Sequence, residues 1–223
     1  ADVIEAFHMC QYAFAKGFEG LLGQAFSDEI SDKDCFAKWR PRGVIAAITP
    51  WNFPVAIPLW SLGMALAIGN TVVLKPSEET PLCAEELTKL IERAGFPPGV
   101  FQLLHGHGEK VGKALVAHPE VDAVIFTGSL EVGRKIKQEV ALSDKKFCTV
   151  ETGSKSAVIV LKSADMDNLA IPAAIASAFK TAGQRCVSAS RILVHRKRYD
   201  EFCGKFVRTA RKLRVDNPVN PHS

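Results

Sequence analysis

The stretch GVIAAITPWNFPVAIPLWSLGMALAIGNTVVLK, residues 43–75, decides the fold of this chain. It begins with a short apolar run typical of a β-strand, which Pro50 follows closely. Residues 55–68 are apolar and rich in small side chains, which is typical of a buried helix. Gly69 and Asn70 end that helix, and residues 71–75 form the next β-type run. A strand, a helix and another strand in this order predict parallel neighbouring strands.

The same alternation continues along the chain. Further strands are predicted at residues 100–104, 123–126, 148–151, 157–161 and 191–195, and helices at 2–22, 81–94, 109–117, 130–140, 165–182 and 199–213. The polar, acidic segment 26–42 interrupts this pattern, and we expect it to form a protruding hairpin. The sequence therefore predicts an α/β fold, an open, mainly parallel Rossmann-like sheet with helices on both faces.

The composition is that of an ordinary globular protein, with 47% hydrophobic and 23% charged residues. A net charge of +4 is too small to indicate nucleic acid as a partner, and no stretch is apolar enough to predict a membrane span. The six cysteines form no C-x-x-C pair, so we expect no metal site and a reducing, cytoplasmic compartment. The first residues are typical of a helix interior and not of a signal peptide, and we expect a fragment cut at both ends.

Two loops that follow predicted strands carry polar groups. Asn52 lies in a turn made rigid by Pro50 and Pro54, where its amide is either an oxyanion donor or part of a structural turn. Lys75 ends the next predicted strand and Glu78 follows it closely, at the end where ligands bind in open α/β sheets. There they either bind ribose hydroxyls and phosphate or belong to a solvated loop.

Three further features suggest chemistry. The turn G-x-G-x-x-x-G at residues 106–112 would bring backbone N–H groups near a phosphate, but it departs from the G-x-G-x-x-G dinucleotide fingerprint and suits a plain turn equally well. Glu151 ends a predicted strand, where a carboxylate can serve as a general base. Cys186 follows the long helix and is either a nucleophile or an inert core thiol.

Taken together, these pieces resemble the NAD(P)-dependent aldehyde dehydrogenase superfamily. The similar segments are PWNFP (50–54), ALAIGNTVVLKPSEETP (65–81), AGFPPGVFQLLHGHG (94–108), FTGSLEVG (126–133), ETGSKSAVIV (151–160) and GQRCVSASR (183–191). They occur in the family's order, with near-family spacing, from about residue 40 to the end of the chain. The resemblance implies oxidation of an aldehyde to a carboxylate through a thiohemiacetal and a thioester.

The resemblance also implies the role of each candidate. Cys186 matches the nucleophile, Asn52 the oxyanion-hole amide and Glu151 the general base that activates water, for which we expect partial burial. The cofactor-binding residues that it implies are Ile48, Thr49, Pro50, Trp51, Lys75, Ser77, Glu78, Gly108, Gly112, Phe126, Thr127, Gly128, Ser129, Val132, Thr152 and Gly153. NAD is expected in preference to NADP, since Glu78 would repel a 2′-phosphate.

The implied domains are an NAD-binding domain over residues 1–25 and 43–153, a hairpin of the oligomerisation region over 26–42, and the start of an α/β catalytic domain over 154–223. A full-length protein of this kind is expected to form a homodimer or homotetramer. We expect Cys186 to be the reactive thiol and Cys35 to be open to solvent. The cysteines expected to be buried as small hydrophobic residues are Cys10, Cys83, Cys148 and Cys203.

The chain departs from the family's E-L-G-G-K motif, with Thr152 where Leu is commonest and Ser154 where a second Gly is usual. FTGSLEVG and the cysteine segment also resemble glutamate-semialdehyde dehydrogenases, although those usually carry Ser where Val187 stands. A coenzyme-A-acylating enzyme, against which Glu151 argues, stays open as well, and so does a non-catalytic nucleotide-binding module.

Overall fold

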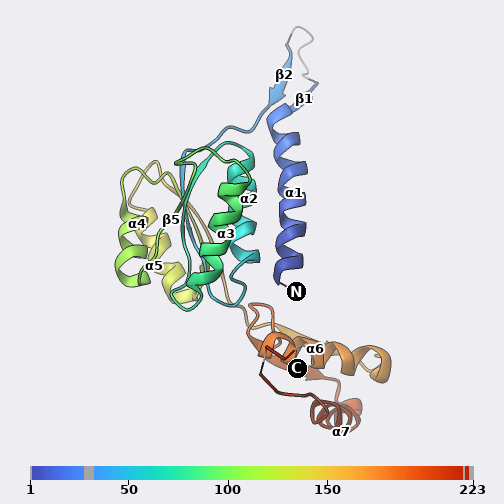
Figure 1. The fold of residues 1–223 in the computed structure, drawn as a ribbon. Coiled ribbons are helices and arrows are strands. Elements are labelled where there is room, and N and C mark those ends of the chain that lie inside the picture. Colours follow the sequence, from blue (N-terminus) through green and yellow to red (C-terminus); the bar gives the residue numbers. More distant parts are fainter. Residues whose placement is uncertain (1, 28–32, 218, 221–223) are drawn as a thin grey trace. The chain divides into compact units, whose positions relative to one another are not determined.

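The computed structural model describes residues 2–27, 33–217, 219 and 220, and the chain divides into two compact units. The first unit is Ala1–Thr152 and the second is Gly153–Ser223. Figure 1 shows the elements of each unit.

The first unit is built on a five-stranded sheet in which every neighbouring pair of strands is parallel. The strands are β3 (Val44–Ile48), β4 (Thr71–Lys75), β5 (Phe101–Leu103), β6 (Ala123–Gly128) and β7 (Phe147–Thr152). Their order in the sheet is β5-β4-β3-β6-β7. The chain therefore adds β4 and β5 on one side of β3, and then β6 and β7 on the other side. The predicted parallel sheet is confirmed, and β6 continues two residues beyond the predicted end at Phe126.

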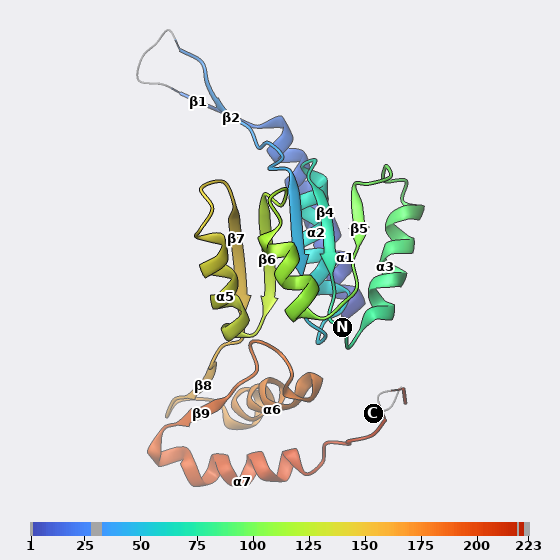
Figure 2. The same ribbon diagram turned by 90° about the vertical axis from the view of Figure 1, so that its left-hand side faces the viewer.

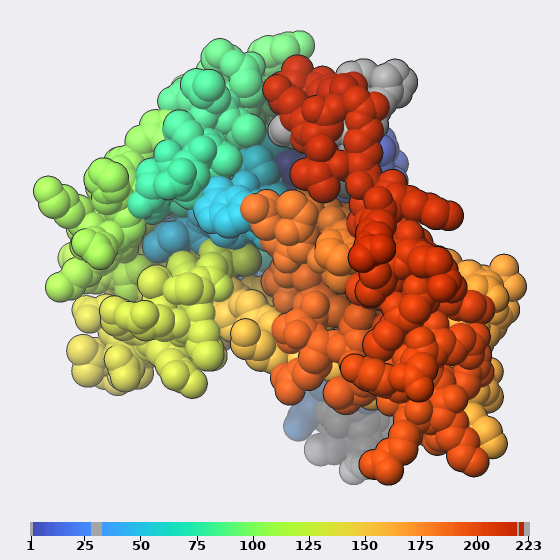
Figure 3. All heavy atoms as spheres, turned by 90° about the horizontal axis from the view of Figure 1, so that it is seen from below, coloured from blue at the N-terminus to red at the C-terminus, as the bar shows by residue number. Residues whose placement is uncertain are grey.

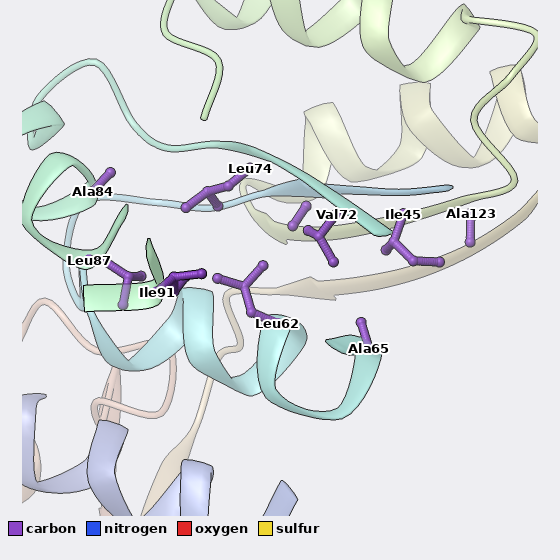
Figure 4. Close-up of a cluster of buried hydrophobic side chains, with 10 residues drawn as sticks. Ile45, Leu62, Ala65, Val72, Leu74, Ala84, Leu87, Ile91 and Ala123 are labelled. Carbon is purple, nitrogen blue, oxygen red and sulfur yellow. The ribbon is translucent and has the colours of Figure 1, made fainter. Parts of the chain in front are cut away.

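One face of the sheet is covered by α2 (Ala56–Ala67) and α3 (Pro81–Arg93). The core on this face joins alternate strand residues to both helices, because successive side chains of a strand point to opposite faces. Its members include Ile45, Ala47, Leu62, Val72, Leu74, Leu87 and Ile91. Figure 4 draws this cluster of buried side chains. Leu62 and Leu74 are fully enclosed.

The opposite face carries α5 (Leu130–Val140) and α4 (Lys113–Ala117), which a π-helical turn at Gly108–Gly112 precedes. The intervening strand residues, among them Ala46, Ile48, Val124 and Phe126, pack here against both helices. Figure 2 shows α5 in front of the sheet and α1 and α2 behind it. The two faces together confirm the prediction of helices on both sides.

Helix α1 (Asp2–Leu22) packs on α2 through small residues. A Cβ added at Gly17 would lie 2.6 Å from the Cβ of Ala67, and one added at Gly63 would lie 2.9 Å from that of Ala13. The apolar residues that predicted this helix lie largely on its other side, where Phe7, Phe14 and Phe18 are exposed. The prediction that Cys10 is buried is therefore wrong, because its side chain is exposed.

After α1 the chain forms an antiparallel hairpin of β1 (Gln24–Phe26) and β2 (Cys35–Ala37), which extends beyond the end of α1 in Figure 1. Cys35 is exposed, as expected. The tip of the predicted hairpin, residues 28–32, lies outside the described residues.

The second unit contains the parallel pair β8 (Ala157–Val160) and β9 (Arg191–Val194) with α6 (Ile171–Phe179) and α7 (Tyr199–Ala210). The helix predicted over 165–182 is wrong in its detail: a π-helical turn at Met166–Ala170 precedes α6, and Thr181 and Ala182 have φ values of 57° and 53°. Left-handed backbone cannot continue a right-handed helix, so α6 ends at Phe179. Helix α7 ends three residues before the predicted 213.

Leu62→Ala should lower the free energy of unfolding by about 2–5 kcal/mol, because Leu62 is fully enclosed between α2 and the sheet. Urea denaturation followed by circular dichroism measures this loss. The matched control is Leu142→Ala, since Leu142 is 84% exposed after α5 and its truncation should change stability by less than about 0.5 kcal/mol. Equal losses in the two variants would contradict the assignment of this core.

Candidate active site

The ends of four neighbouring strands bring candidate residues of the first unit to one edge of the sheet. Ile48 pairs with Lys75 on one side and with Phe126 on the other. One residue further along, Thr127 pairs with Glu151. Figure 3 looks onto this edge from below, where the light-blue segment near residue 50 and the yellow-green segment near residue 130 reach the surface. The edge also includes the switch point between β3 and β6, where ligands bind in open α/β sheets.

Lys75 lies at the end of β4 and is only 2% exposed. Its Nζ donates to the carbonyl oxygen of Pro76 at 2.9 Å and to Oε2 of Glu78 at 3.1 Å. The ammonium keeps further donor capacity, since it carries three protons. Ser77 is also buried, and its Oγ accepts a hydrogen bond from the backbone N–H of Glu79.

Glu78 presents a carboxylate that is held in its charged form. Its own backbone N–H, and then the ammonium of Lys75 and the backbone N–H of Gly108, hold the pKa of this carboxyl below its usual range, while slight burial opposes them. Nδ1 of His107 also lies 3.6 Å from its Oε1. The G-x-G turn therefore lies beside Glu78, and an ionised acceptor faces any ligand bound at this edge.

The segment after β3 leads from Thr49 to Asn52. Thr49 is buried; its backbone N–H donates to the carbonyl oxygen of Lys75 at 3.1 Å, whereas its Oγ1 has no hydrogen-bond partner within the described chain. Pro50 and Asn52 are half-buried, and Trp51 is 43% exposed.

A long-range contact fixes the far end of this segment. The carboxylate of Asp2, on α1, accepts hydrogen bonds from the backbone N–H groups of Val55 and Ala56, at the start of α2. It thus satisfies donors that the first turn of a helix leaves unpaired. Phe53, only 8% exposed, packs with Ala6 of α1 in the same place. Sequence reasoning missed Asp2, because nothing local indicates a contact across more than fifty residues.

The segment after β6 begins α5. Thr127 and Gly128 end the strand and are half-buried. Ser129 is the N-cap of the helix, where its Oγ accepts from the backbone N–H of Val132 at 3.3 Å. A Cβ added at Gly133 would lie 2.6 Å from Cγ1 of Val150, so this glycine lets α5 approach β7 closely. Phe126 is buried in the core, and Val132 is exposed.

Glu151 is exposed at the end of β7, so the expectation of partial burial is wrong. Thr152 beside it is half-buried. Gly108 leaves room for a ligand, because a Cβ added there would meet nothing within 4 Å. A Cβ added at Gly153, the first residue of the second unit, would also meet nothing within 4 Å. Gly112, in contrast, is buried in the π-helical turn.

Cys186 belongs to the second unit, in a turn after α6. Its side chain is half-buried, as are Cys83, Cys148 and Cys203, and all six cysteines are free thiols. Desolvation by neighbouring atoms of the protein raises the pKa of the Cys10 thiol, which disfavours its thiolate. The carbonyl oxygen of Cys186 accepts from the hydroxyl and the backbone N–H of Ser154.

The first unit thus gathers the candidates for binding a dinucleotide at one edge of its sheet, together with Asn52 and Glu151. The residues of this unit fit such a ligand, with a buried lysine, an ionised glutamate, a buried hydroxyl that lacks a partner in the described chain, and Gly108, where an added Cβ would meet open space. In the described part of the chain, no group of three or more His, Cys, Asp or Glu residues is placed to hold a metal ion.

Among the same residues, no helix is both long and apolar enough to cross a membrane.

A comparison with protein families finds that the model of the aldehyde dehydrogenase family matches residues 1–223. Among curated proteins, aldehyde dehydrogenase 1A1 of Homo sapiens is 46% identical over 186 residues, which are 83% of this chain and 37% of that protein. The chain therefore spans little more than a third of the length of this relative.

Solved structures agree with the sequence comparison. Betaine aldehyde dehydrogenase of Staphylococcus aureus, in complex with NAD+, has a TM-score of 0.89 and 33% identity over 97% of this chain and 42% of its own. The 3,6-anhydro-L-galactose dehydrogenase in complex with NADP has a TM-score of 0.90 and 34% identity, over 100% of this chain and 46% of its own. Similarity at this level extends through both units.

Proposed function

This chain belongs to the aldehyde dehydrogenase family, and we propose that it is the part of an NAD(P)-dependent enzyme that binds the dinucleotide and carries the nucleophile. The whole enzyme would oxidise a small aldehyde to a carboxylate. The observation that carries the proposal is the strand register at one sheet edge, which joins Lys75, Phe126 and Glu151 to the segment that holds Asn52. The matched relatives and structures support it.

The proposal assigns residues 1–25 and 43–153 to the cofactor domain, 26–42 to the oligomerisation hairpin and 154–223 to the start of the catalytic domain. In the full-length protein the hairpin would contribute to a homodimer or homotetramer, and a cytoplasmic location suits six free thiols. These assignments rest on the family and on the exposed hairpin strands.

For the cofactor, Glu78 would accept hydrogen bonds from the ribose hydroxyls, and buried Lys75 would donate to the same ribose. Thr49, at the end of the neighbouring strand, offers a hydroxyl that has no hydrogen-bond partner among the described residues. The start of α5, after Gly128 and Ser129, provides the positive end of a helix dipole for a pyrophosphate. The remaining proposed contacts are Ile48, Pro50, Trp51, Ser77, Gly108, Gly112, Phe126, Thr127, Val132, Thr152 and Gly153.

For the chemistry, the thiolate of Cys186 would attack the aldehyde carbon, and the side-chain amide of Asn52 would stabilise the oxyanion that develops. A bound nicotinamide would supply the acceptor for hydride. Glu151, whose side chain is exposed at the end of β7, would then take a proton from the water that hydrolyses the thioester on Cys186.

The protein should bind NAD more tightly than NADP, because the ionised Glu78 repels a 2′-phosphate. The lowered pKa of Glu78 keeps this charge present at mildly acidic pH. In Glu78→Gln the ratio of the NADP Kd to the NAD Kd should fall about tenfold, since one like-charge contact is removed. Calorimetric titration with both dinucleotides gives the ratio.

Glu79→Gln is the matched control, because it removes the same charge from the adjacent exposed position and should leave the ratio unchanged. Tighter binding of NADP by the unmodified protein, or an equal effect of the two substitutions, would show that Glu78 does not face the 2′ position.

In the complete enzyme, Glu151→Gln should slow steady-state turnover about 10²–10⁴-fold, because hydrolysis loses its base while acylation keeps thiolate and oxyanion donor. Stopped-flow absorbance should show a pre-steady-state burst of NADH followed by a very slow phase. Asn52→Ala provides the contrast, since it should depress the burst itself. Turnover of Glu151→Gln at the unmodified rate would place water activation elsewhere, and stimulation by coenzyme A would then indicate an acylating enzyme.

A further inference from the structure

Within the second unit, the segment after Gly153 is joined to the segment that carries the nucleophile by a set of hydrogen bonds. Ser154 donates twice to the carbonyl oxygen of Cys186, from its Oγ at 3.0 Å and from its backbone N–H at 3.3 Å. Further along, both the backbone N–H and the Oγ of Ser190 donate to the carbonyl oxygen of Ser156, at 3.0 and 3.1 Å. We call these contacts the serine clasp.

The hydrogen bonds determine which acceptor each hydroxyl proton of Ser154 and Ser156 points toward. Oγ of Ser154 lies 2.6 Å from Oγ of Ser156, and either oxygen could be the donor in that pair. A hydroxyl has a single proton, and Ser154 uses its own for the carbonyl oxygen of Cys186. Ser156 must therefore donate to Ser154, so the hydroxyl protons of Ser154 and Ser156 are both used in hydrogen bonds.

Ser154 stands at a position where a second glycine is usual in similar sequences. A glycine there would keep the backbone N–H and lose the hydroxyl, so the shorter of the two bonds to Cys186 depends on the serine side chain. We propose that Ser154 is a positioning residue for the nucleophile: its hydroxyl fixes the peptide after Cys186 against the segment that begins at Gly153.

This inference rests on the proposed role of Cys186. A fixed peptide restricts the thiol to few directions, and preorganised geometry of this kind raises the rate of attack. Without the Ser154 hydroxyl, the peptide after Cys186 would be less restrained. The thiol would then adopt more orientations, and a reagent could reach it in only some of them. The half-buried state of Cys186 makes its reactivity sensitive to such a change.

The test measures the second-order rate constant for alkylation of Cys186 by iodoacetamide, by peptide mass mapping, from about pH 6.5 to 9.5. Ser154→Ala and Ser154→Gly should lower this rate constant about two- to tenfold at each pH, the effect expected from losing one ordinary hydrogen bond. Ser154→Thr keeps the hydroxyl and should retain the unmodified rate. The cofactor Kd should be the same in all variants.

Ser190→Ala is the matched control, because it removes one serine hydroxyl of the same clasp that does not contact Cys186. It should lower the melting temperature as much as Ser154→Ala does and leave the alkylation rate unchanged. An unmodified rate in Ser154→Ala and Ser154→Gly, a low rate in Ser154→Thr, or an equal loss in Ser190→Ala would overturn the inference. Faster labelling of Cys148 or Cys203 than of Cys186 in the unmodified protein would instead refute the proposed nucleophile.

Discussion

All five strands of the sheet in the first unit run in one direction, so their carboxyl ends lie along one edge. The register then sets which residues are neighbours at that edge: Lys75, Ile48 and Phe126 share one row, and Glu151 and Thr127 share the next. Groups about a hundred residues apart in the sequence thereby reach one place. Because β3 lies between strands that the chain adds in opposite directions, the segment with Asn52 begins at the switch point.

Packing on both faces holds this edge in place. The strands alternate apolar side chains between the core under α2 and α3 and the core under α4 and α5, so a slip by one residue would exchange the two sets. Small residues let α1 lie close to α2, and Asp2 then reaches the start of α2 to accept from its free N–H groups. The turn with Asn52 is thus held at one end by β3 and at the other by α1.

Periodicity predicted most of the fold, because apolar alternation and helix-ending residues such as Gly69 act locally. Periodicity did not predict features that depend on contacts between residues far apart in the sequence. The apolar spacing of α1 identified the helix but not the face that packs on α2, which consists of small residues, so the burial of Cys10 was predicted wrongly. The left-handed backbone of Thr181 and Ala182 and the exposure of Glu151 also had no local signal. Ser154 was visible as a departure from the motif, and only the structure gives its partner.

On the function proposed above, the dinucleotide binds at the carboxyl edge of the five-stranded sheet. Hydrogen–deuterium exchange with and without saturating NAD, resolved by peptide mass, tests it most directly. Binding at this edge should slow exchange in residues 49–54, 75–78, 106–112 and 126–133. Exchange should stay unchanged in the loops at the opposite edge, residues 95–100 and 118–122. Protection confined to that opposite edge, or no protection in any of the four segments, would contradict it.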